Sequence, residues 1–164
     1  MPLDLNNTED VQTIHIDHPR DALSLIGKRF VSPWFSMDHD RAELWEQGTY
    51  LDLIPDAYYE EGYGDGLVEG YHLLGMLDYL MNQVLTTGGR WVTWNYGLDR
   101  VRFVSVIRER DRFRLTGSIV NVEERKQGFL VTNDIVAEVH GREKPGFIAT
   151  QLALWTTIGE PDPT

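Results

Sequence analysis

The chain has 164 residues, of which 41% are hydrophobic and 25% charged, and these values predict a single soluble globular domain. It has no cysteine, which excludes disulfides, a thiolate nucleophile and Cys-ligated metal centres. The formal net charge of −11 disfavours nucleic acid and anionic membranes as partners, because both recognise clustered Lys and Arg. No apolar run is long enough to span a bilayer, and the polar N-terminus is not typical of a secretory signal, so we expect a cytoplasmic protein.

The first part of the chain predicts short elements. Residues 1–12 have no apolar periodicity and predict a flexible tail. After an extended piece, the pattern predicts a short helix over 20–26 and then a strand over 28–37. Asp38 is a good N-cap for a helix over 40–47.

The segment 49–66, TYLDLIPDAYYEEGYGDG, differs from its surroundings. It holds four tyrosines and five carboxylates and shows no clean period. We therefore predict a long structured loop, and long loops in compact domains are often functional.

Residues 66–86 predict the strongest helix in the chain. Apolar side chains cover most of its circumference, which is typical of a buried helix. Gly70 and Gly75 lie inside it, at a cost of about 1 kcal/mol each relative to alanine. We expect that each marks a close approach to a backbone or a ligand.

The rest of the chain predicts strands. They cover 90–96, 100–107, 111–123, 128–140 and 146–158. An antiparallel sheet wrapped round one helix is an α+β arrangement, and its open edge favours a partner chain. We expect one domain over 13–158, with a flexible C-terminus over 159–164.

A local basic stretch extends from Arg100 to Arg114. It is either a strand with solvated alternate positions or a docking surface for a phosphate-bearing carrier.

Several strings resemble the MaoC-like dehydratase family of the hotdog fold. They are Ser32-Pro33-Trp34, residues 38–45, residues 67–74 and residues 95–103. The most specific string is Asn95-Tyr96-Gly97 followed by Val101-Arg102-Phe103, and the likeness extends over residues 22–157.

The resemblance implies a hotdog fold, in which an antiparallel sheet wraps a central buried helix and two copies pair into a homodimer with a continuous sheet. It implies a small-molecule substrate, a CoA or carrier-protein thioester, whose acyl chain lies at the dimer interface. An Asp and a His add or remove water, and a backbone N–H at the start of the central helix, here that of Gly70, polarises the thioester carbonyl. It implies no cofactor.

The chain departs from the family at the acid–base residues. The Asp position falls on Leu51, next to Asp52, and the His position falls on Asp56. The family's His-Gly before the central helix is Glu69-Gly70 here. Two carboxylates in close contact can share a proton, so an acid–base site without histidine is possible.

Four residues are therefore candidate catalytic groups: Asp52, Asp56, Glu69 and His72. The alternatives are capping or solvated roles for the acids and a core role for the histidine. Glu69 and His72 also have the spacing of a Glu-x-x-His metal pair, but no second such motif is present, and we expect no metal. The candidate substrate-binding residues, which could instead serve packing, are Tyr50, Tyr58, Tyr59, Tyr63, Gly70, Tyr71 and Asn95.

Three functions remain open at this stage. The first is an acid–base lyase, a dehydratase or hydratase, acting on an acyl thioester or related carbonyl compound. The second is a biosynthetic cyclase or isomerase that uses carboxylate and tyrosine chemistry. The third is a non-catalytic hotdog subunit.

Overall fold

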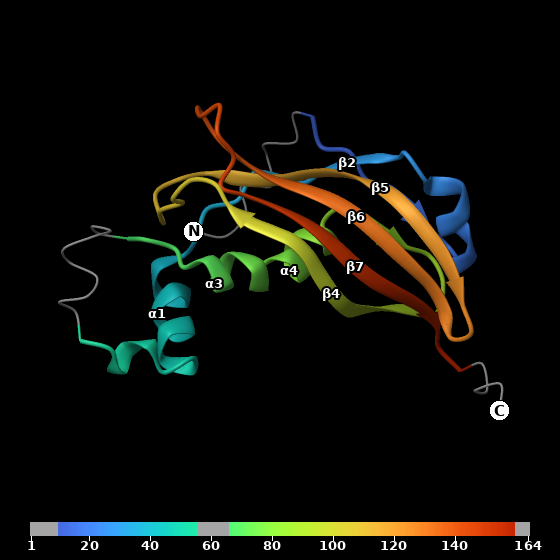
Figure 1. Ribbon diagram of the computed structural model, residues 1–164, viewed down its shortest axis with the longest axis horizontal. Helices are drawn as coiled ribbons and strands as arrows, with labels where there is room; N and C mark the ends of the chain where they lie inside the picture. Colours follow the sequence, from blue (N-terminus) through green and yellow to red (C-terminus); the bar gives the residue numbers. More distant parts are fainter. Residues whose placement is uncertain (1–9, 56–65, 160–164) are drawn as a thin grey trace.

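The computed structural model describes residues 10–55 and 66–159. Its main sheet has five antiparallel strands in the order β2-β5-β6-β7-β4. The strands are β2 (Arg29–Val31), β5 (Phe113–Arg125), β6 (Gly128–Val139), β7 (Phe147–Thr157) and β4 (Trp91–Phe103). The sheet curves over two short helices, α3 (Gly70–Gly75) and α4 (Leu77–Asn82) (Figure 1). The predicted α+β fold, with a sheet wrapped round the central helix, is confirmed.

The three long strands β5, β6 and β7 form where the sequence predicts them. Side chains of a strand alternate between its two faces, and β7 buries every second residue from Phe147 to Trp155. The buried side faces the helices, so the core lies between the sheet and the α3–α4 segment. Its largest fully buried side chains are Trp155, Phe30, Phe113 and Phe147.

The prediction of two separate strands over 90–96 and 100–107 is wrong, because β4 is continuous. It pairs with β7 along its length, with register shifts between Asn95 and Gly97 and between Asp99 and Arg102. Arg100 takes a left-handed conformation, with φ of 52°. The turn-like sequence is therefore accommodated as irregularities within one edge strand.

The central helix is shorter than the predicted range 66–86 and is interrupted at Met76. Before it, Val68 N–H donates to the Ile107 carbonyl at 3.0 Å, so this stretch is tied to another segment in extended form. After it, Leu85–Thr87 forms β3, which pairs in parallel with β1 (Ile14–Ile16).

The central helix is also less enclosed than its composition predicts. Leu73, Leu77 and Leu80 are buried against the sheet, whereas Tyr71 is 79% exposed. Within one copy of the chain, the helix therefore has one covered face and one open face.

The elements before the central helix are α1 (His39–Gly48) and two 3₁₀ turns, η1 (Pro19–Leu25) and η2 (Leu51–Leu53). The prediction of α1 is confirmed: the Asp38 carboxylate accepts from Arg41 N–H at 3.2 Å and caps the helix. The predicted helix over 20–26 is the 3₁₀ turn η1. The predicted strand over 28–37 is only three residues long, because Pro33 follows and cannot donate to a ladder.

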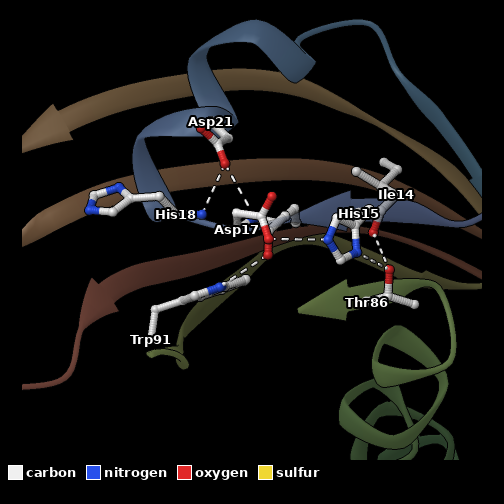
Figure 2. A network of polar contacts seen from close by, with 8 residues as sticks. Ile14, His15, Asp17, His18, Asp21, Thr86 and Trp91 are labelled. Atoms are coloured by element: carbon white, nitrogen blue, oxygen red, sulfur yellow. Dashed lines mark hydrogen bonds and ion pairs between the residues drawn. The ribbon is translucent and has the colours of Figure 1, made fainter. Parts of the chain in front are cut away.

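A polar network holds β1 against β3 and the start of β4 (Figure 2). The His15 ring Nδ1 lies 2.9 Å from Thr86 Oγ1, and Trp91 Nε1–H donates to the Ile16 carbonyl at 3.3 Å. Asp21 accepts from the backbone N–H of His18 at 2.9 Å. The network fixes the Trp91 ring at the edge of the core.

None of the helices in residues 10–55 and 66–159 has the length and hydropathy of a membrane-spanning segment.

Candidate active site

A cavity of about 690 Å³ lies between α1 and the α3–α4 segment. Its wall is largely apolar and aromatic, and includes Phe35, Met37, Trp45, Met76 and Tyr79. His72, one of the predicted catalytic residues, lines the same cavity. A pocket of this size can hold a small organic substrate.

His72 stacks on Trp45 inside this cavity. The two rings are 4.6 Å apart at their centroids and nearly parallel, with an interplanar angle of 6°. His72 is 8% exposed, and burial lowers the pKa of its imidazole below 6.5. The side chain therefore presents a neutral imidazole to the cavity at neutral pH.

Glu46 follows Trp45 on α1, and the pKa of its carboxyl group is raised. Burial raises the pKa of Glu46, and the charge of Glu69 raises it further. Glu109, Glu43 and Asp52 add smaller contributions in the same direction. Burial and these neighbouring negative charges both disfavour the ionised form, so Glu46 keeps its proton to a higher pH than an ordinary glutamate.

The sequence interpretation did not identify Glu46. The signal was present in the helical period: Ala42 is buried and Trp45 half-buried, and Glu46 is four residues after Ala42. It therefore falls on the inward stripe of α1.

Glu69 and Gly70 form the first turn of α3. Glu69 is the N-cap residue and is half-buried. A Cβ at Gly70 would lie 2.5 Å from Cζ of Phe103, so the glycine allows the Phe103 ring to lie against the helix. Gly70 thus marks a close approach, but to an aromatic side chain and not to the predicted backbone or ligand.

Apart from His72, none of the described candidates, Glu69 and Gly70 included, is among the residues that line the cavity. Asp52 is exposed on η2, and its charge contributes to the raised pKa of Glu46. Tyr50 and Tyr71 are 73% and 79% exposed. Asn95 Nδ2–H donates to Asp78 Oδ2 at 2.8 Å. Four further predicted residues lie outside the described part of the chain: Asp56, Tyr58, Tyr59 and Tyr63.

The described residues include no group of three or more His, Asp or Glu side chains arranged to bind a metal ion.

Two named proteins are similar to this chain in sequence. The chain is 28% identical over 129 residues to 3-hydroxyacyl-thioester dehydratase Z of Mycobacterium tuberculosis, covering 76% of this chain and 85% of that protein. It is 26% identical over 151 residues to nodulation protein N of Rhizobium leguminosarum, covering 87% of this chain and 91% of the relative. No family model matches.

A solved structure shares the fold. The monoamine oxidase regulatory protein from Archaeoglobus superimposes with a TM-score of 0.65 at 13% identity, over 90% of this chain and 99% of that one. The chain is therefore similar to MaoC-like hotdog proteins. The resemblance predicted from the sequence is thereby confirmed. The MaoC-like chain combines the expected fold with glutamates around the start of α3.

Proposed function

We propose that this MaoC-like chain is an acid–base lyase that adds water to, or removes it from, an acyl thioester. The observation that carries the proposal is the raised pKa of Glu46, which burial raises first and the charge of Glu69, at the start of α3, raises further. The 28% identity to a 3-hydroxyacyl-thioester dehydratase supports the reaction class.

In the proposed mechanism, one glutamate is the acid and the other is the base. In the hydration direction, the water oxygen bonds to the β-carbon of a 2-enoyl thioester while a base takes the water proton. An acid then delivers a proton to the α-carbon. Glu46, whose pKa is raised, is the acid, and Glu69 is the base. Dehydration reverses these steps, with Glu46 taking the α-proton and Glu69 protonating the departing hydroxyl.

The neighbouring cavity provides the substrate site. Its apolar wall, with Phe35, Met37 and Met76, suits the hydrocarbon part of an acyl chain. His72 and Trp45 form a stacked pair that limits the cavity on one side. Gly70 N–H remains the group that we predict to bind the thioester carbonyl, with CoA or a carrier protein as the thiol part.

The proposal includes a homodimer. β4 is an edge strand of the main sheet, and it exposes Trp94 and Tyr96 at 59% and 60%. An exposed edge with large aromatic side chains is a suitable surface for strand-to-strand pairing. Pairing there would extend the sheet across two copies.

Activity measurements with crotonyl-CoA and longer enoyl-CoA esters test the proposal. The loss of absorbance of the conjugated double bond reports hydration. We expect Glu46→Gln and Glu69→Gln each to lower kcat by about 100-fold or more, which is typical for the loss of an acid or base. The matched control Glu124→Gln changes an exposed glutamate on β5 and should stay within about twofold of the wild type.

The outcomes separate the alternatives. Wild-type turnover in both glutamate variants would exclude them as acid and base. Turnover of a free carbonyl compound, with none of any thioester, would instead favour a cyclase or isomerase.

A further inference from the structure

A second cavity, of about 360 Å³, lies at the C-terminal end of α4. Its lining comes from α4 and β3 and from the neighbouring sheet strands β4, β7 and β6. It shares no lining residue with the cavity beside α1. Neither Glu46 nor Glu69 is among its lining residues.

Two buried amides form part of its wall. Asn133 on β6 and Gln151 on β7 are 1% and 5% exposed and are direct partners across the two strands. Asn133 Nδ2–H donates to Gln151 Oε1 at 3.3 Å. Each amide group has two N–H donors and a carbonyl oxygen, so this one bond leaves most of their capacity available.

These amides interrupt an apolar surface. The neighbouring inward-facing residues on the two strands, Val131, Ile135, Ala149 and Ala153, are all buried and apolar. Burying two amides among them carries a desolvation cost that a hydrogen-bonding occupant would offset. Ala153, which also lines the cavity, has only a small side chain.

An indole N–H at the wall is unused as well. Trp155 is fully buried and lines the cavity, and within the described residues its Nε1 has no hydrogen-bond partner. The adjacent Trp91, whose ring centroid is 5.1 Å away, donates its own Nε1–H to Ile16 (Figure 2). The wall therefore offers aromatic surface, and the Trp155 indole N–H behind it reports on changes at this wall.

The charge of the lining disfavours an anionic occupant. Of the described residues around the cavity, Asp78 is the single charged one, and its Oδ2 accepts from Asn95. An anion would be repelled by Asp78 and would find no Lys, Arg or His in that lining. Thr87 and Thr93 add hydroxyl groups, which suit neutral donors and acceptors.

We propose that this cavity is a binding site for a neutral aromatic ring that carries hydroxyl or carbonyl groups. The ring packs on the tryptophans, and its oxygens bond to the Asn133–Gln151 amides. A cavity of about 150 Å³ holds benzene, so 360 Å³ has room for a ring with substituents.

Tryptophan indole N–H resonances in two-dimensional NMR provide a site-specific test. The probe is 4-hydroxyacetophenone, which has a ring, one hydroxyl and one carbonyl, and ethylbenzene is the matched probe without oxygens. Single Trp→Phe variants assign the signals of the five tryptophans. We expect 4-hydroxyacetophenone to shift the Trp155 signal saturably and to bind at least fivefold more tightly than ethylbenzene, because at least one hydrogen bond differs.

Two variants locate the effect. The double variant Asn133→Val with Gln151→Leu removes both amides together, so that neither is left unpaired, and should weaken binding about tenfold or more. If the double variant does not fold, Thr93→Val tests the exposed rim of the cavity instead. We expect Thr93→Val to weaken the binding of 4-hydroxyacetophenone by about fivefold or less. The comparison of the two probes on the wild-type protein does not depend on either variant.

Equal affinity for both probes, or no change at the Trp155 signal at millimolar concentration, would overturn the proposal. Preferential binding of methyl glucoside over the aromatic probe would overturn the assignment to an aromatic ligand. Activity on enoyl-CoA does not enter this test, so failure here leaves the lyase proposal to its own experiment.

Discussion

Two histidines, one on α1 and one on α3, have pKa values shifted in opposite directions. His39, at the start of α1, lies 3.0 Å from Glu109 Oε2 through Nδ1, and that contact raises the pKa of His39 above 6.5. Burial lowers the pKa of His72 below 6.5. The difference follows from solvent access, because His39 is exposed and ion-paired and His72 is enclosed against Trp45.

The sign of each shift determines its effect on stability. The contribution of His39 is fully present below pH 6.5 and is lost as the pH rises through its raised pKa. The contribution of His72 is present above pH 6.5 and is lost as the pH falls through its lowered pKa. Histidine-ring NMR titration should show His72 titrating below 6.5 and His39 above it.

The matched variant Glu109→Gln should lower the pKa of His39 towards 6.5 and leave His72 unchanged. A His72 signal that titrates above 6.5 would contradict its enclosure by the cavity wall.

Among the elements, the turn between β3 and β4 depends on a glycine pair. A Cβ on Gly89 would overlap the backbone carbonyl oxygen of Asp17, which cannot move without displacing the network around β1. We expect Gly89→Ala to lower the free energy of unfolding by about 2 kcal/mol, as overpacking does. A Cβ on Gly48, at the end of α1, would meet none of the described residues beyond its own helix within 4 Å, so Gly48→Ala should be neutral or stabilise by up to about 1 kcal/mol.

Urea unfolding of both variants measures this difference. Equal stability of the two would show that the Asp17 segment can shift at little cost.

Local sequence patterns predicted some of these elements and not others. The cap at Asp38 and the alternation over β5, β6 and β7 are local signals, and they predicted α1 and three strands correctly. The ends of the central helix were wrong because Val68 and Leu85 are held by segments distant in sequence. The raised pKa of Glu46 could not be predicted for the same reason, because its burial and the charge of Glu69 both come from segments outside α1.

For the whole molecule, the proposed homodimer can be tested at β4. Tyr96→Lys places a charge on an exposed edge residue, and we expect it to weaken dimerisation at least tenfold, because a charge would be buried on pairing. Val120→Lys on β5, at a residue 41% exposed, is the matched control and should leave the mass in solution unchanged. Analytical ultracentrifugation gives both results, and a monomeric wild type would contradict the pairing.

The parallel pairing of β1 with β3 has a kinetic consequence. His15 and Thr86 are 71 positions apart along the chain, whereas β5 and β6 are joined by a two-residue hairpin turn. Closing the longer loop costs more chain entropy, so the hairpins can form early and the N-terminal strand docks late. Before β1 docks, the indole N–H of Trp91 lacks its acceptor, the Ile16 carbonyl, and the sheet is exposed to water beside Trp91.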